Sequence, residues 1–353
     1  MFIIDLYKLD SSLEFTLTHH HPNASIKRVN PDESFLMLPD QDTGQTGAEF
    51  DQELHDVDAV EAIVAPYGEA LVHLYFRVVH PSFPILHKKL FLEKYKRTHR
   101  EFAPCLLSAV YLIALNWMKY DPELSEVPTP DIDKLEKIAT RCMSDVISHP
   151  KLSTIQAGLL MLQRLGPAAS SKSWALNAQL VAVGQELGLH LDCMEWRIPN
   201  WEKGLRKRLA WALYMQDKWG ALTHGRPSHI TSVNWAVRQI ALEDFPEIPR
   251  DGGNEGEVVE LENGKVLFME MIKLTQITGE ILDGFFTVDA SRVLEGKISR
   301  VLERAKPLQI KLKDWHARLP DVLRMDSTSR VKKLSSNGMF ACGFIFSCVC
   351  VCD

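Results

Sequence analysis

Apolar residues recur at the spacing of an α-helix through most of this chain. One stripe consists of Leu71, Leu74, Tyr75, Val78 and Val79. These residues fall at i, i+3, i+4, i+7 and i+8, which places them on one face of a helix. Pro81 then ends the helix, because proline cannot continue the backbone hydrogen bonds. Strand patterns with hairpin turns do not compete with this spacing. The fold class is therefore predicted to be all-α.

The same spacing predicts a series of further helices. They cover residues 88–98, 105–118, 132–146, 153–165, 174–187, 201–222, 266–286 and 291–305. Short loops join many of them, so we expect a multi-helix bundle of consecutive antiparallel helices. Pro307 is expected to break or restart the pattern that follows. The longest apolar run, 105–118, is shorter than the roughly 20 residues that cross a membrane, so a buried helix is predicted there and no membrane contact is expected.

Changes in composition divide the chain. Residues 1–58 lack periodic apolar spacing and are predicted to be a disordered N-terminal segment. A helical domain is expected over 59–245, a linker rich in proline, glycine and acidic residues over 246–265, and a C-terminal helical extension over 266–340. The Cys-, Phe- and Val-rich stretch 341–353 differs from everything before it and is interpreted as an aberrant or truncated tail.

Charge and cysteine content limit the classes of function. The chain has 40 Lys and Arg against 46 Asp and Glu, a net charge of −6, so it lacks the overall basic character of a nucleic-acid-binding domain. Its seven cysteines have no disulfide spacing, which favours a reducing compartment. Two clusters of metal-ligand type are His19, His20 and His21, and Cys348, Cys350 and Cys352. Neither has the neighbouring ligands that would close a four-ligand site, so no metal or cofactor is predicted in this chain.

The most site-like stretch joins a helix end to a short loop. It contains Asp217, Lys218, His224, Arg226 and His229. A cation is favoured near a helix C-terminus, and a guanidinium can hold a carboxylate through two hydrogen bonds. One interpretation is structural, with Arg226 clamping Asp217 or a neighbouring helix. The other is a pocket for an anionic metabolite. The structural interpretation is favoured, and both stay open.

For three other groups of residues, a structural role is favoured over a functional one. His80–Pro84 reads HPSFP, in which two prolines fix an extended turn and Phe83 fills the core, so a structural role is favoured over catalysis.

Arg206–Arg208 could contact phosphate or act in nuclear import, but a solvated helix face, or pairing with carboxylates such as Glu202, is favoured. The basic residues of the stretch Lys88–Arg100 are interpreted as the solvent-exposed face of an amphipathic helix. The sequence carries no nucleophile elbow, phosphate loop or zinc-protease motif, so an enzyme is not predicted.

Three stretches together resemble a known family. They are Leu71–His87, Leu180–Cys193 and Arg206–Ile230. In this order they resemble the regulatory domain, or middle homology region, of fungal zinc-cluster transcription factors. Tyr75–Pro84 is similar to the family pattern of a tyrosine or phenylalanine, two further residues and then Val-His-Pro-x-Phe-Pro, and Gly225–Pro227 is similar to its Gly-Arg-Pro pattern.

This resemblance implies a nuclear regulator of RNA polymerase II genes of metabolism, with nitrogen use as a narrower expectation. Implied partners are other transcription regulators, a homo- or heterodimer, and a small-molecule effector. The family reads DNA through an N-terminal zinc cluster of six cysteines, whereas no cysteine precedes Cys105 here. Zinc and DNA binding are therefore expected only through a missing or partner module, in a truncated gene product or a tethered coactivator. The alternative is a helical protein-interaction adaptor without its own DNA binding.

Overall fold

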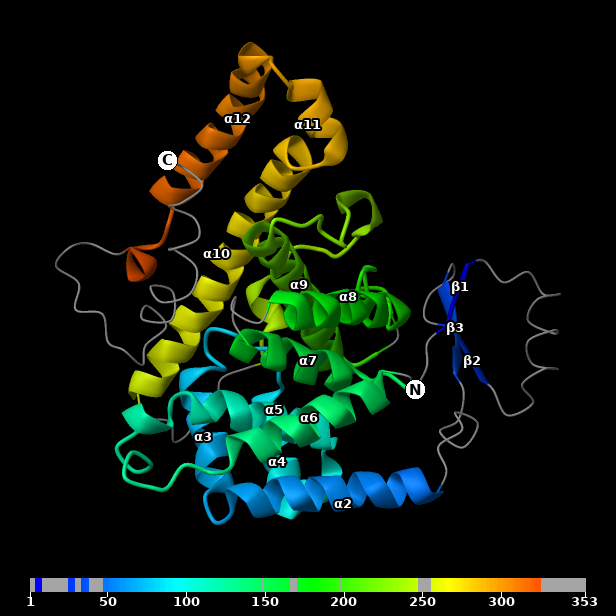
Figure 1. Ribbon diagram of the computed structural model, residues 1–353, viewed down its shortest axis with the longest axis vertical. Coiled ribbons are helices and arrows are strands. Elements are labelled where there is room, and N and C mark those ends of the chain that lie inside the picture. Colours follow the sequence, from blue (N-terminus) through cyan, green and yellow to red (C-terminus); the bar gives the residue numbers. More distant parts are fainter. Residues whose placement is uncertain are drawn as a thin grey trace.

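The computed structural model describes residues 4–7, 25–28, 33–37, 47–147, 149–165, 170–196, 198–246 and 255–324. The described residues from 47 onward form a helical body (Figure 1). Its helices are α2 (Gly47–Val64), α3 (Gly68–Val78), α4 (Lys88–Arg97), α5 (Pro104–Leu115), α6 (Ile132–Val146), α7 (Leu152–Leu165), α8 (Ser170–Glu186), α9 (Asn200–His224), α10 (Glu255–Phe285), α11 (Val288–Leu294) and α12 (Ile298–Ala317). The all-α prediction is confirmed for this body. Within the described ranges, none of the helices is long and apolar enough to cross a membrane.

Helix α5 forms the centre of the first half of the body. All of its residues are buried, because the sequence PCLLSAVYLIAL is apolar around its whole circumference. Pro104 starts the helix at a position where its missing N–H costs nothing, and the hydroxyl of Ser108 donates to the Pro104 carbonyl at 2.7 Å. Helices α2, α3, α6 and α7 all pack against α5.

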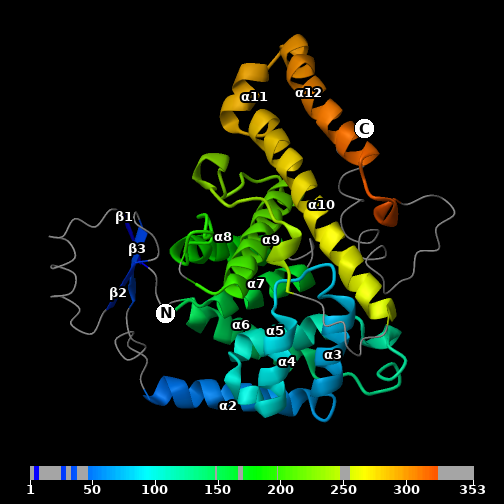
Figure 2. The same cartoon turned by 180° about the vertical axis from the view of Figure 1, so that it is seen from behind.

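The second half is a stack of helices that follows the chain order. Helix α7 packs on α8, α8 on α9, and α9 on α10. Gly225 ends α9 in the left-handed conformation, with φ of 60°, as expected of a glycine cap. Helix α10 crosses the body diagonally, and α12 returns beside its upper part after the short α11 (Figures 1 and 2).

Three features differ from the divisions expected from the sequence. Helix α2 begins at Gly47, within the segment expected to be disordered, because Val57, Val60 and Val64 give it a buried stripe. Helix α10 begins at Glu255, within the expected linker. Pro307 lies inside α12 and does not interrupt it, since no residue of α12 is buried and water can satisfy the carbonyl group that proline leaves free.

A small sheet also lies within residues 1–58. Its strands are β1 (Ile4–Tyr7), β2 (Ser25–Arg28) and β3 (Glu33–Met37). The central β3 pairs antiparallel with both neighbours, so that Phe35 lies opposite Asp5 and Lys27. Short segments without clear alternation gave no strand signal in the sequence. The histidine triplet at 19–21, the cysteines at 348–352 and the tail 341–353 lie outside the described residues.

Candidate functional site

The predicted cluster at the end of α9 is built around the carboxylate of Asp217, which is fully buried. It accepts hydrogen bonds from the Asn177 amide at 2.9 Å, the Ser228 hydroxyl at 2.5 Å, and the backbone N–H groups of His229 at 3.1 Å and Ile230 at 2.9 Å. The imidazole Nδ1 of His229 lies 2.8 Å from the same carboxylate. One side chain of α9 therefore fixes both α8 and the loop after Gly225.

The remaining predicted residues surround Trp174 of α8. The His229 ring lies 4.3 Å from the Trp174 ring, between ring centroids, and the His224 ring lies 6.0 Å from it. The guanidinium of Arg226 lies over the same indole at 5.8 Å, a cation–π contact. Asp217 and His229 are thus brought together, whereas Arg226 contacts the neighbouring helix α8, the second structural alternative, instead of Asp217. The reason is geometric, because the left-handed turn at Gly225 directs Arg226 toward α8.

Lys218, next to Asp217 on α9, supports the same loop. Its ammonium group donates to the Ile230 carbonyl at 2.7 Å and lies 5.4 Å from the Tyr214 ring centroid. Burial lowers the pKa of Lys218 below its ordinary value. The end of α9 is therefore a packed junction in which both neighbouring charges face the protein interior.

The basic triplet Arg206–Arg208 does not form a solvated face, so that interpretation is wrong. All three side chains are buried. Arg206 donates to Glu202 at 3.0 Å, the carboxylate partner expected from the sequence, and to the Leu187 carbonyl at 2.9 Å. The sequence gives the charge of these residues but not their surroundings, and three consecutive positions on a helix point in three directions.

The other two members of the triplet also hold α9 to distant segments. Lys207 forms an ion pair with Asp244, at 2.5 Å, in the segment after α9. Arg208 donates to the carbonyls of Pro84 and Leu86. Burial lowers the pKa of Arg208 to about 10. In the folded chain, these buried groups are unavailable as a phosphate contact or an import signal.

The HPSFP turn is where the two halves of the body meet. The Phe83 ring packs against Phe268 of α10 at 6.4 Å between centroids, as the core-filling role predicted. Gly264 of α10 lies so close to the Pro81 carbonyl that a Cβ there would overlap it. His80 is buried against Phe76, and burial lowers its pKa well below the ordinary value, so its imidazole is neutral.

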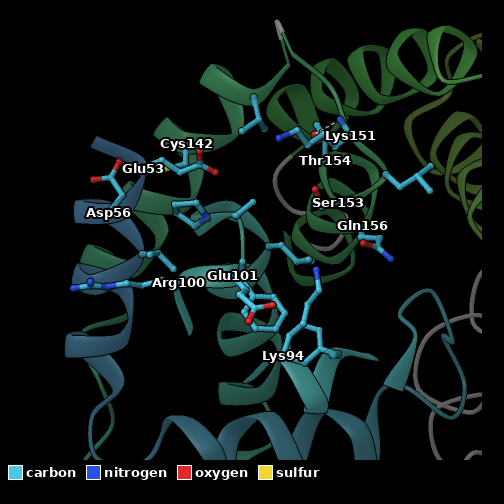
Figure 3. A pocket seen from close by; sticks show the side chains of 18 of the residues that line it. Glu53, Asp56, Lys94, Arg100, Glu101, Cys142, Lys151, Ser153, Thr154 and Gln156 are labelled. Atoms are coloured by element: carbon cyan, nitrogen blue, oxygen red, sulfur yellow. Dashed lines mark hydrogen bonds between the residues drawn. The ribbon is translucent and has the colours of Figure 1, made fainter. Parts of the chain in front are cut away.

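A cavity of about 940 Å³ lies between α2, α4, α5, α6, α7 and α9. It was not predicted, because no local sequence pattern marks a space between helices that are distant in the chain. Its lining is mixed, with apolar residues such as Phe91 and Leu106 and polar residues such as Asp56 and Gln156. Lys94 of α4 points toward the side lined by Ser153 of α7 (Figure 3). Its size and mixed lining suit an amphipathic small molecule.

Hydrogen bonds within the protein hold the polar groups along one wall of this cavity. Asp56 of α2 accepts from Arg141 at 2.6 Å, Gln52 at 2.9 Å and the Cys142 thiol at 3.5 Å. Burial, followed by the charge of Asp56, raises the pKa of Cys142 to about 12, which keeps it a thiol. These groups can bind and position a molecule, but they do not supply an activated nucleophile.

Comparison with known proteins decides the family. The model of the fungal specific transcription factor domain matches residues 72–317, which include the HPSFP turn, the buried triplet and the Asp217 cluster. The chain belongs to this family. The resemblance seen in the sequence is thereby confirmed, and the matched stretch runs from α3 through α12.

Several relatives carry names from gene regulation. The transcriptional activator protein DAL81 of Saccharomyces cerevisiae is 36% identical over 89% of this chain and 35% of its own length. The acetamidase regulatory protein of Emericella nidulans is 25% identical over 83% of this chain and 36% of its length. Cutinase transcription factor 1 alpha of Fusarium vanettenii is 26% identical over 62% of this chain and 24% of its length. The chain thus spans about a third or less of these relatives, and no solved structure matches it.

Proposed function

We propose that this chain is the regulatory domain of a fungal transcription regulator that acts in the nucleus on RNA polymerase II genes of metabolism, including genes of nitrogen use. The observation that carries the proposal is the family match over residues 72–317. The names of the relatives, a transcriptional activator and a regulator of acetamidase, support the same function. We expect the domain to act through binding to other regulators rather than through chemistry on a substrate.

The architecture supports a scaffold that holds neighbouring modules in one of two states. Asp217 and the basic triplet Arg206–Arg208 tie α9 to α8, to the HPSFP turn and to the segment around Asp244. An effector in the 940 Å³ cavity would contact α2, α4 and α7 together. It would shift the domain between states only if it bound them with unequal affinity.

DNA binding is assigned to another module or to a partner protein. The three cysteines in the described part of the chain, Cys105, Cys142 and Cys193, are each buried as free thiols and cannot form a zinc cluster with one another. Zinc would belong to a cluster module elsewhere in the full protein or in a partner. The second candidate, a coactivator without its own DNA binding, is favoured by the burial of Arg206–Arg208, which removes the densest basic triplet of α9 from the surface.

Transcript profiling tests the proposal. Residues 72–317 are removed in frame from the chromosomal gene, and RNA is sequenced from cells grown on different nitrogen and carbon sources. The expected result is a changed level of a defined set of metabolic transcripts. A matched strain with the single substitution Gly220→Ala, which has room for the added methyl group, should keep the wild-type profile. The proposal would be contradicted if the deletion strain had the same transcript profile as the wild type on every nitrogen and carbon source.

A further inference from the structure

Helix α12 is an amphipathic helix that the body leaves largely uncovered. None of its residues, Ile298–Ala317, is buried. Its partly covered side faces α10 and carries Leu312 and Trp315, which pack against the core. It stands at the outer side of α10 in both views (Figures 1 and 2). Packing of this partly covered side on α10 stabilises the helix and leaves its opposite side facing the solvent.

One stripe of α12 combines apolar and basic side chains. Ile298, Leu302, Lys306 and Lys313 fall at i, i+4, i+8 and i+15, so they share one side of the helix. Ile298 is 77% exposed and Leu302 is 63% exposed, and both lysines are exposed as well. We call these four residues the α12 stripe. Large aliphatic side chains at this exposure, gathered on one helix side, mark a surface for a partner.

The charge around the stripe is opposite to that of the rest of the molecule. Residues 297–318 carry seven Lys or Arg and two Asp or Glu, a net charge of +5, whereas the whole chain has −6. Within the part that the structure describes, neither Lys306 nor Lys313 has a carboxylate partner, although Lys311 on the other flank pairs with Glu280 at 2.5 Å. Lys306 lies one turn beyond Leu302 along the stripe, and Lys313 lies about two turns further.

We propose that the α12 stripe binds an acidic polypeptide segment that carries aliphatic or aromatic side chains, such as an acidic amphipathic helix of a partner protein. Ile298 and Leu302 would take its apolar side chains, and Lys306 and Lys313 would pair with its carboxylates. A nucleic acid would satisfy the lysines but leave the aliphatic pair in water. The chain's own residues 325–353 have three basic and two acidic side chains and do not offer the required charge.

This inference does not rest on the proposed regulatory function, because it follows from the surface of α12 alone. The probe is a fluorescein-labelled peptide about 20 residues long, built from repeated Asp-Asp-Phe-Asp-Leu units. Its binding to the full chain is followed by fluorescence anisotropy at low salt. A second peptide with serine in place of each Phe and Leu keeps the charge and removes the apolar anchors.

Two double variants separate the two contributions. Ile298→Ser with Leu302→Ser, and Lys306→Glu with Lys313→Glu, are each expected to weaken binding of the Phe/Leu peptide by about tenfold or more. The serine peptide should bind wild type about tenfold more weakly than the Phe/Leu peptide. All four side chains are exposed, and circular dichroism melting checks that the variants fold like wild type.

Helix α4 supplies the matched control. It is also basic, and its exposed Lys89 and Lys96 can be replaced by glutamate for the same change in charge. None of the large exposed hydrophobic side chains of the described residues lies on α4. Lys89→Glu with Lys96→Glu should leave peptide binding within about twofold of wild type, apart from a general charge effect.

Four results would overturn the proposal. They are equal binding of the two peptides, equal loss in the α4 control, tighter binding of a duplex DNA of the same charge, and a dimer in sedimentation that the α12 substitutions abolish. The last result would assign the stripe to a second copy of the chain.

Discussion

At the scale of single residues, Asp217 shows how a charged side chain can organise a junction. Its carboxylate, which is itself fully buried, meets four hydrogen-bond donors and the His229 ring. Sequence spacing placed Asp217, His224, Arg226 and His229 in one cluster. It could not reveal that Trp174 of α8 stands between Arg226 and the rest, because that contact joins distant parts of the chain.

Asp217→Ala should lower the free energy of unfolding by about 3–5 kcal/mol, because it strands several buried donors and leaves a void. Chemical denaturation monitored by tryptophan fluorescence measures this loss. The matched control is His224→Ala, whose ring makes an edge contact with Trp174 and a long contact with Ser173, and which should cost less than about 1 kcal/mol. Equal losses in the two variants would contradict the role given to Asp217.

His80 gives the protein a pH dependence of known sign. Burial, and then the charge of Arg208, lower the pKa of His80 well below its ordinary value in the folded chain. The unfolded chain therefore binds a proton near pH 6.5 that the folded chain does not bind. Stability should fall as the pH falls below about 6.5, by up to about 1.4 kcal/mol per pH unit.

Urea titrations between pH 7.5 and pH 5.5, the range about one unit either side of an ordinary histidine, measure this effect. The variant His80→Phe keeps an aromatic ring beside Phe76 and removes the titrating group. It should lose stability less steeply than wild type over the acidic half of the range. Parallel pH profiles in the two proteins would show that His80 does not contribute.

At the scale of helices and strands, periodicity in the sequence was sufficient for the helices that have a one-sided or fully apolar pattern. Helix α5 is the clearest case, and α3 follows its predicted stripe. The pattern was less informative where packing between distant segments decides the outcome. The start of α2 was not predicted because only its second half carries buried valines. The burial of Arg206–Arg208 was not predicted because each of the three has a partner distant in sequence, namely the Leu187 carbonyl, the Asp244 carboxylate and the Leu86 carbonyl.

The contact between α10 and the HPSFP turn depends on a missing side chain. Gly264→Ala should force α10 away from the Pro81 carbonyl and cost about 1–3 kcal/mol. Gly220→Ala in α9 is the matched control, since its nearest neighbour, Trp174, would be 3.7 Å from the new methyl group. That substitution should raise stability by about 0.5–1 kcal/mol. Thermal unfolding of both variants checks the pair, and a stable Gly264→Ala would contradict the close approach.

At the scale of the whole molecule, the distribution of charge predicts that the folded chain binds DNA weakly. The net charge is −6, the triplet Arg206–Arg208 is buried, and the exposed cations of the described residues are spread over several separate elements, including α4, α6 and α12. The purified chain should bind duplex DNA no more tightly than a Kd of about 1 µM at physiological salt. Fluorescence anisotropy over a salt series measures this, and tight, salt-resistant binding to a defined duplex would contradict it.

The central claim is that this helical body controls transcription when another module brings it to a promoter. The most direct test expresses the chain in a fungal cell, once fused to an unrelated DNA-binding module and once without it, and measures a reporter gene that carries that module's binding site. The account predicts that the fusion changes reporter transcript relative to the module alone, that the unfused chain does not, and that Asp217→Ala abolishes the effect of the fusion. Reporter output that is the same for the fusion and the module alone would contradict the account.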